Sequence, residues 1–316
     1  MKTNFVRQPY AVISLAGLAL SLAVGSAVAQ ELKVGSMVWE TANPFYSNYI
    51  KGQQDAAAKY GIDLDVQNGN SKLETQVAAV QQFITQGKDA IIVTPGDAQA
   101  IVPIVKQAVS AGIPVIAANN NVGDGVEIVT FVGSSNYDFG QLQCQLLVEA
   151  IGDTGTVGYI LGALGTDPQV NREKGFTDCL ADHPGIEIVE KQTANWDFQQ
   201  ALAVVQDWLN KYPEGQLAAI VDQGPEAVNG ARHAQEIGRS DVKFVLGNYP
   251  ETVQKAIIDG VVFGTIVEDP YTQGYTSIEY AYYWLTDQQD KVERPQHYMK
   301  NPVIKADNAA SVPPEM

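Results

Sequence analysis

Apolar runs and amphipathic segments alternate along almost the whole of this 316-residue chain. Several runs are continuously apolar, such as Ala90-Ile91-Ile92-Val93 and Leu217-Ala218-Ala219-Ile220-Val221, as expected for parallel strands that helices cover on both faces. The predicted strands are residues 33–38, 62–66, 89–94, 113–118, 127–132, 155–161, 186–190, 217–221, 242–246 and 261–267. The predicted helices are residues 45–60, 73–86, 98–110, 137–151, 170–182, 198–210, 225–238, 250–259 and 271–285. This alternation predicts an α/β fold with doubly wound parallel sheets.

Two lobes accommodate this number of strands better than one. Ten strands or so would make an unusually wide open sheet, so we expect two sheets of about five strands each. Small polar residues at Gly133-Ser134-Ser135-Asn136 and the strand end at Glu268-Asp269-Pro270 predict two crossovers. The first lobe is then expected to take residues 30–134 and 269–297, and the second residues 135–268 and 298–316. A crossover of several strands is a hinge, and a ligand is expected in the cleft between the lobes.

The first 29 residues have the pattern of a secretory signal peptide. Lys2 and Arg7 are basic, residues 11–24 are apolar, and Ala27-Val28-Ala29 fits a cleavage site after Ala29. A membrane anchor is the alternative, but the apolar run is shorter than the ~18 residues that a spanning helix needs. Removal of the signal peptide takes away Lys2 and Arg7, so the periplasmic protein that we expect has 18 basic and 36 acidic residues, a net charge of −18. Such charge argues against binding nucleic acid through its phosphates.

The two cysteines, Cys144 and Cys179, lie on predicted helices of the second lobe that flank one strand. Because an exported protein enters an oxidising compartment, we expect a disulfide worth roughly 3 kcal/mol; buried free thiols are the alternative. His183, His233 and His297 are scattered, and there is no C-x-x-C motif. The sequence therefore predicts no metal site and no cofactor.

The loop from Trp39 to Tyr46 lies between the first predicted strand and the helix that begins near Phe45. This position is the carboxyl edge of a sheet, where open α/β folds bind ligands. The loop carries the amide of Asn43, three aromatic residues and no glycine-rich phosphate cradle. This composition suits a neutral polyhydroxylated molecule better than a nucleotide. The alternative is that Phe45 and Tyr46 only anchor the helix in the core.

Several segments, in this order and spacing, resemble type I periplasmic solute-binding proteins of the ribose/galactose-binding family. They are Asn43-Pro44-Phe45-Tyr46, Lys88-Asp89-Ala90-Ile91-Ile92-Val93-Thr94-Pro95, Ala111-Gly112-Ile113-Pro114-Val115-Ile116, Asn171-Arg172-Glu173-Lys174-Gly175-Phe176, Val245-Leu246-Gly247-Asn248, and Asp259-Gly260 before the strand that ends at Glu268. The resemblance covers nearly all of residues 31–305. It implies two lobes that close on a sugar held between aromatic rings and deliver it to an ABC permease in the inner membrane.

The resemblance also implies a set of ligand-binding residues. They are Asn43, Phe45, Tyr46, Asn119 and Asn120 in the first lobe, Arg172, Trp196, Asp222, Gln223 and Asn248 in the second, and Glu268 at the hinge. Trp196 as a packing residue, Arg172 as a surface ion pair and Asn119-Asn120-Asn121 as a turn are the alternatives. The pair Asn119-Asn120 replaces an Asp-Arg pair common in the ribose branch, and Asp222-Gln223-Gly224-Pro225 departs from the usual Asn-Asp ending.

The charges of these residues indicate the class of ligand. Arg172 is the one cation, against Glu268 and Asp222, so the site should reject phosphorylated and carboxylated ligands. It should favour a neutral monosaccharide or sugar alcohol, with an amino sugar as the alternative.

Three other functions can be compared with this one. An enzyme is disfavoured because the chain lacks a G-x-S-x-G elbow, a P-loop and a G-x-G-x-x-G fingerprint. A LacI-type repressor, which shares the sugar-binding core, would begin with a helix-turn-helix where this chain has a signal peptide. A periplasmic sensor for a chemoreceptor or histidine kinase stays open, since the same closed form could serve transport or signalling. We expect the protein to act as a monomer.

Overall fold

The computed structural model describes residues 1–4 and 31–315, and residues 31–315 form one compact unit. The strands are β1 (Leu32–Val38), β2 (Ile62–Asn68), β3 (Ala90–Val93), β4 (Val115–Ala118), β5 (Thr130–Ser134), β6 (Thr154–Leu161), β7 (Gly185–Thr193), β8 (Ala219–Asp222), β9 (Lys243–Gly247), β10 (Gly264–Ile266), β11 (Gln296–Met299) and β12 (Val303–Lys305). The helices are α1 (Pro44–Tyr60), α2 (Leu73–Gln86), α3 (Val102–Ser110), α4 (Asn136–Ile151), α5 (Asp167–Leu180), α6 (Phe198–Lys211), α7 (Val228–Glu236), α8 (Glu251–Ile258), α9 (Pro270–Leu285) and the short 3₁₀ helix η1 (Gln289–Lys291).

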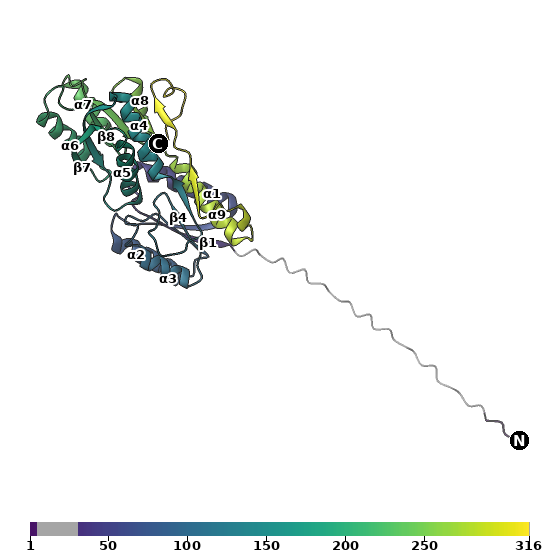
Figure 1. Ribbon diagram of the computed structural model, residues 1–316. Coiled ribbons are helices and arrows are strands. Elements are labelled where there is room, and N and C mark those ends of the chain that lie inside the picture. The colour runs from purple at the N-terminus through teal and green to yellow at the C-terminus, as the bar shows by residue number, and fades with distance from the viewer. Residues whose placement is uncertain (5–30, 316) are drawn as a thin grey trace. The chain divides into compact units, whose positions relative to one another are not determined.

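The strands form two separate sheets, one in the lower and one in the upper part of the folded unit in Figure 1. The first has the order β11-β5-β4-β3-β1-β2, and the second has the order β12-β10-β9-β8-β6-β7. All pairings are parallel except that of β12 with β10. Each sheet has an apolar core on both of its faces. The predicted α/β fold with two doubly wound lobes is confirmed.

Both sheets reverse their winding direction at an equivalent place. In the first, β1 lies between β2 and β3, and in the second β6 lies between β7 and β8. The loops that leave neighbouring strands there turn to opposite faces, which opens a crevice at the carboxyl edge of the sheet. The fold therefore places the loops after β1, β3 and β4 in one lobe and those after β6, β8 and β9 in the other at ligand-binding edges.

The chain passes between the sheets where β5 leads into α4, where β10 leads into α9, and where β11 leads into β12. The first two crossings lie at the predicted positions. The third differs from the expectation that residues 298–305 belong wholly to the second lobe, because β11 pairs with β5 of the first sheet. An apolar strand at a sheet edge leaves backbone groups unpaired, and β11 supplies the partner that β5 needs. Asn301 Nδ2 joins the crossings by donating to Ser134 Oγ at 2.9 Å and to the Val267 carbonyl at 3.1 Å.

Each lobe contains a pair of helices in very close contact. A Cβ on Gly52 of α1 would lie 2.1 Å from the Tyr271 carbonyl oxygen of α9, and one on Gly274 would lie 2.0 Å from that of Tyr49. Gly140 of α4 and Gly175 of α5 show the same relationship, with contacts at 2.1 Å and 2.0 Å. Only glycine permits this approach of two backbones. Because this glycine-mediated helix contact occurs once in each lobe, the two lobes have equivalent architectures.

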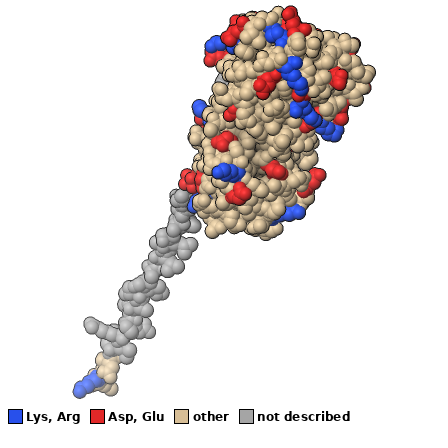
Figure 2. All heavy atoms as spheres, turned by 90° about the vertical axis from the view of Figure 1, so that its left-hand side faces the viewer, with Lys and Arg blue, Asp and Glu red and all other residues tan. Residues whose placement is uncertain are grey.

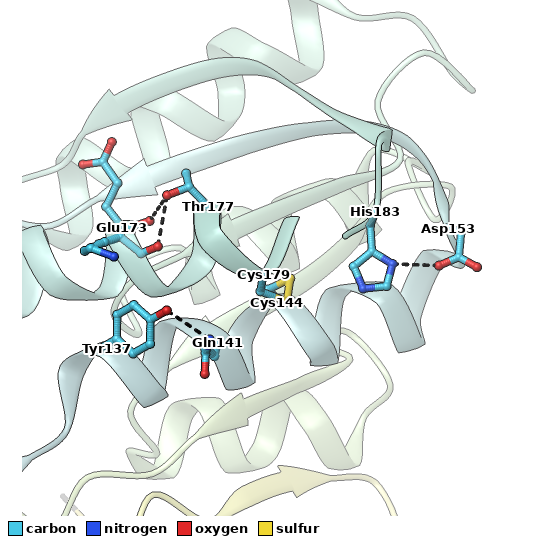
Figure 3. The surroundings of a disulfide bond; sticks show 9 residues. Tyr137, Gln141, Cys144, Asp153, Glu173, Thr177, Cys179 and His183 are labelled. Carbon is cyan, nitrogen blue, oxygen red and sulfur yellow. Dashed lines mark hydrogen bonds and ion pairs between the residues drawn. A yellow bond between two sulfur atoms is a disulfide. The ribbon is translucent and has the colours of Figure 1, made fainter. Parts of the chain in front are cut away.

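Figure 3 shows that α4 and α5 are also joined covalently, by a disulfide between Cys144 and Cys179. The bond closes a loop with a sequence separation of 35 residues. The same view contains His183, whose Nδ1 lies 2.9 Å from an Asp153 oxygen. His183 therefore has an ordinary partner at the protein surface.

Two helices begin later than the sequence predicts, for one physical reason. The predicted helix 98–110 begins at Val102, because Asp97 Oδ1 accepts the backbone N–H groups of Gln99 and Ala100 in a turn. The predicted helix 225–238 begins at Val228, because the Asp222 carboxylate accepts the N–H groups of Gly224 and Ala227. Aspartate competes with helical hydrogen bonding in this way.

The predicted signal peptide, residues 1–29, lies outside the described residues except for residues 1–4. Within the part of the chain that the structure describes, no helix is long and apolar enough to cross a membrane.

Candidate functional site

A cavity of about 430 Å³ lies between the carboxyl edges of the two sheets. Residues from the loops after β1 and β4 line one side of it, and residues from α5 and the loops after β7, β8 and β9 line the other. Glu268, at the second crossing, is part of the lining. The size is that of a small-molecule site, and the position between two lobes is the one that the sequence predicts.

The structure brings most of the predicted site residues together. Those that line the cavity are Asn43, Phe45, Tyr46, Asn119, Asn120, Arg172, Trp196, Asn248 and Glu268. Asp222 and Gln223 do not line it. The Asp222 carboxylate holds the loop before α7, and the Gln223 side chain bonds to Gly162, Tyr159 and Gln169 inside the second lobe. The prediction that these two side chains face the cleft is therefore wrong, because groups inside the second lobe take up their hydrogen bonds.

Sequence reasoning missed other residues of the lining. They are Trp39, Pro44, Pro168, Phe198, Pro225, Glu226, Val228, Asn229, Pro250, Glu251 and Thr252. Trp39 could have been found, since it directly follows β1 in the same loop as Asn43. Glu226 could not have been found from the sequence. It faces the cavity because the hydrogen bonds of the Asp222 carboxylate fix the shape of the turn that precedes α7.

Arg172 and Glu268 form the polar centre of the site. The guanidinium Nη2 lies 2.5 Å from a Glu268 oxygen, and the side chains are 2 % and 4 % exposed. Arg172 also donates to Asn136 Oδ1 at 3.0 Å and to the Gln223 carbonyl at 2.7 Å. Asn248 Nδ2 donates to the same Glu268 oxygen at 3.2 Å. The guanidinium also lies 3.7 Å from the centroid of the Phe139 ring. The ion pair is thus buried, fixed by further hydrogen bonds and close to neutral in total.

The first-lobe wall has one group that lacks a partner. Asn119 is satisfied, since it accepts from Tyr46 Oη at 2.9 Å and donates to Gln273 at 3.1 Å. Asn120 donates its Nδ2 to the Pro95 carbonyl at 2.8 Å, but its Oδ1 is buried with no hydrogen-bond partner among the described residues. A buried acceptor without a donor costs about 1–3 kcal/mol. Asn120 Oδ1 is therefore placed to accept a hydrogen bond from a ligand.

Several site residues have strained backbones. Asn119, Trp196 and Asn248 have φ angles of 60°, 58° and 57°, and each follows a strand. Asparagine tolerates this left-handed region, but a bulky residue such as tryptophan rarely adopts it. Strain of this kind concentrates at functional sites, where the surrounding structure must hold it. The conformation of Trp196 therefore favours a role in binding over a role in packing alone.

Aromatic rings of both lobes meet at the cavity. The Trp196 ring lies over Gly162, where a Cβ would approach the ring to 1.9 Å. Trp196 also packs against the apolar cluster of the first lobe that contains Trp39 and Tyr46. The Ala98 N–H reaches the Gly165 carbonyl of the opposite lobe at 3.5 Å. The lobes therefore contact each other around the cavity.

Asp222, at the end of β8, and Glu226, in the loop that follows, have raised pKa values. Burial raises the pKa of Asp222 to about 7, although it accepts two backbone hydrogen bonds. Burial, together with the neighbouring Asp222, raises the pKa of Glu226 well above its ordinary value. Only Glu226 of the two lines the cavity. The two side chains are 1 % and 3 % exposed, so both charges are poorly solvated.

The outer surface carries charges of both signs. On the face drawn in Figure 2, acidic and basic side chains are interspersed over the folded unit. No group of three or more His, Cys, Asp or Glu side chains that could hold a metal ion occurs within residues 1–4 and 31–315.

Comparisons with known proteins agree with this geometry. The family model described as periplasmic binding protein domain matches residues 34–289. The ribose import binding protein of Escherichia coli is 29% identical over 268 residues, which is 84% of this chain and 89% of that protein. The xylitol-binding protein of Mycolicibacterium smegmatis is 29% identical over 238 residues, 75% of this chain and 67% of the relative. An ABC transporter solute-binding protein of Bacillus halodurans, solved with bound myo-inositol, superposes with a TM-score of 0.81 at 25% identity, covering 89% of this chain and 96% of its own.

Proposed function

The chain belongs to the periplasmic binding protein domain family, and we propose that it is the solute-binding component of an ABC importer that binds a monosaccharide or sugar alcohol. The observation that carries the proposal is the cavity between the two sheet edges, lined by aromatic rings and amide groups of both lobes. Relatives named for ribose, xylitol and myo-inositol support the same class of ligand.

The side chains of the cavity match the chemistry of a polyol. A sugar or sugar alcohol has C–H faces that stack on aromatic rings, here Phe45 and Trp196. Its hydroxyl groups can donate to Asn120 Oδ1, which has no hydrogen-bond partner within residues 1–4 and 31–315, and to the Glu268 carboxylate. The free hydrogen-bonding capacity of the site is thus supplied from both lobes.

Charge limits the ligand further. Arg172 is the only Lys or Arg among the residues that line the cavity, and Glu268 already pairs with it. A phosphate or carboxylate group would enter a buried site without a compensating cation, which is costly. We therefore expect neutral sugars and polyols to bind and their phosphorylated or oxidised derivatives to be rejected.

The proposal includes a hinge and a cellular role. The lobes are residues 31–134 with 269–299 and residues 135–268 with 303–315, joined by the crossings that Asn301 connects. The protein is exported, cleaved after Ala29, and acts as a monomer without catalytic activity of its own. It hands its ligand to a permease of the inner membrane; a sensor role with a chemoreceptor or kinase is the alternative, and co-purification with either partner separates the two.

A thermal-shift screen tests the class of ligand. The panel contains D-ribose, D-allose, xylitol, D-glucitol and myo-inositol, each with a phosphorylated or carboxylated derivative. A ligand that binds only the native protein raises the midpoint by mass action. We expect a neutral member to raise it and its anionic derivative to leave it unchanged. A larger shift with an anionic member would contradict the proposal.

A further inference from the structure

Glu226 is a buried carboxyl group in the wall of the cavity, and no cation pairs with it among the residues that the structure describes. Its side chain is 3 % exposed, and it lines the cavity from the loop that precedes α7. Among the described residues, its carboxylate forms no ion pair and no hydrogen bond with another side chain. An unpaired buried charge is expensive, and burial accordingly raises the pKa of Glu226. A cationic group from outside the chain would stabilise the ionised form of this carboxyl group.

The other charges of the cavity are already paired. Arg172 lies 2.5 Å from Glu268, and its remaining contacts go to Asn136, Gln223 and Asn248. Glu251, which also lines the cavity, has Lys255 at 2.7 Å. With these pairs set aside, Glu226 is the one carboxyl group of the cavity lining that has no paired cation among the described residues.

The surroundings of Glu226 suit a cation rather than a hydroxyl group. Asp222 and Asp197 both disfavour a second negative charge at Glu226, and Arg172 offsets them only in part. The Trp196 ring is close by, because a Cβ on Gly224 would meet both Glu226 Oε2, at 2.1 Å, and Trp196 Cε3, at 3.1 Å. A carboxylate beside an indole ring is a favourable setting for an ammonium group, through ion pairing and a cation–π contact.

The absence of a side chain at Gly224 leaves room for the Glu226 carboxyl group beside the Trp196 ring. Any side chain at position 224 would overlap the Glu226 carboxyl group. The Asp222 carboxylate fixes the turn by accepting the N–H groups of Gly224 and Ala227. The loop thus uses one acid to hold its shape and presents the other to the cavity.

We propose that Glu226 is a specificity residue for an ammonium group, so that a sugar or polyol with one hydroxyl replaced by an amine binds more tightly than the neutral parent. The inference rests on the proposed function, because it assumes a polyol ligand in the cavity. It narrows the ligand class to amino sugars and amino polyols.

Calorimetry on matched ligands tests the inference. Each neutral compound is titrated beside its amino forms: D-glucose with 2-amino-2-deoxy-, 3-amino-3-deoxy- and 6-amino-6-deoxy-D-glucose, D-glucitol with 1-amino-1-deoxy-D-glucitol, and myo-inositol with aminodeoxyinositols. We expect the tightest ligand of the panel to be an amino form, bound at least tenfold more tightly than its parent. A neutral compound as the tightest ligand would overturn the inference and leave the proposed function standing. If no compound of either kind bound, the proposed function would fail as well.

Variants then locate the effect. Glu226→Gln keeps the shape of the side chain but removes the charge, and should bring the affinity ratio of amino form to parent to within about twofold of one. Glu236→Gln removes a charge from the exposed end of α7, the helix that follows the Glu226 loop, and should retain the wild-type ratio. An unchanged ratio in Glu226→Gln would contradict the assignment. The comparison of ligands with the wild-type protein tests the inference without any variant.

Discussion

The guanidinium of Arg172, on α5, and the carboxylate of Glu268, at the second crossing between the lobes, form an ion pair of 2.5 Å that is almost fully buried. The pair joins the wall of the cavity to the hinge. Removing one member of a buried pair leaves the other charge unsolvated and costs about 3–5 kcal/mol. We therefore expect Arg172→Met to lower the free energy of unfolding by that amount in chemical denaturation. The double variant Arg172→Met with Glu268→Gln should lose less than the sum of the two single changes, and strict additivity would show that the charges do not interact.

Glu268 should also affect binding. Its second oxygen, Oε1, accepts only a long hydrogen bond of 3.4 Å from Gln273, so it can accept one from a ligand hydroxyl. Glu268→Gln is expected to weaken the ligand by about 1–3 kcal/mol, the value of a charge-assisted bond. Calorimetry with the best ligand of the thermal-shift screen measures this change, and wild-type affinity would remove Glu268 from the binding set.

Trp196 is the predicted stacking residue of the second lobe. Trp196→Ala should weaken ligand binding by about 2–4 kcal/mol, as for other aromatic hot spots, while the unfolding midpoint stays close to that of the wild type. Trp284→Ala, which removes an equally large ring from α9 outside the cavity, serves as the control and should bind normally. If Trp196→Ala bound the ligand with wild-type affinity, Trp196 would be a packing residue and not a ligand-binding one.

The sequence predicts the fold well because each of its signals is local. Runs such as Ala90-Ile91-Ile92-Val93 are buried on both faces in the structure, and Asn43 and Gly61 begin and end α1 as cap residues. The family resemblance indicated Asn43, Asn120 and Trp196 as site residues, and each of them follows a strand and lines the cavity.

The exceptions are side chains whose hydrogen bonds are taken up by other groups of the folded lobe, so that they do not line the cavity. Asp222 and Gln223 also follow a strand, but backbone N–H and C=O groups nearby take up their hydrogen bonds. No local pattern reveals that choice, which depends on the turn around Gly224 and Pro225. The pairing of β11 with the first sheet was also not predictable from a local pattern, since its partner β5 is more than 160 residues earlier in the chain.

The raised pKa of Asp222 predicts how stability depends on pH. Burial holds this pKa at about 7, against an ordinary value of 3.8, so between about pH 4 and 7 the native state keeps a proton that the unfolded state has released. Stability should therefore fall as the pH rises through this window, by an amount on the order of 2–4 kcal/mol for this group. Glu226 acts in the same direction. Denaturation at several pH values should show a shallower decline in Asp222→Asn than in the wild type; parallel profiles would contradict this origin.

The disulfide between Cys144 and Cys179 should stabilise the second lobe. By restricting the unfolded chain, it is expected to contribute roughly 3 kcal/mol. Mass spectrometry without reductant should find the two cysteine peptides linked, and a reductant should lower the unfolding midpoint. The variant with both cysteines changed to alanine should have the unfolding midpoint of the reduced protein, and the reductant should not change that midpoint. Two alkylatable thiols in the unreduced, unfolded protein would refute the bond.

Small-angle scattering with and without ligand tests most directly the claim that one ligand binds between two lobes that close. The protein is measured free and saturated with the tightest ligand of the screen, at a stoichiometry of one established by calorimetry. The account predicts a smaller radius of gyration in the saturated sample, because ligand bridges the Asn120 and Trp196 sides of the cavity and favours the closed form. An unchanged scattering profile at saturation would contradict it.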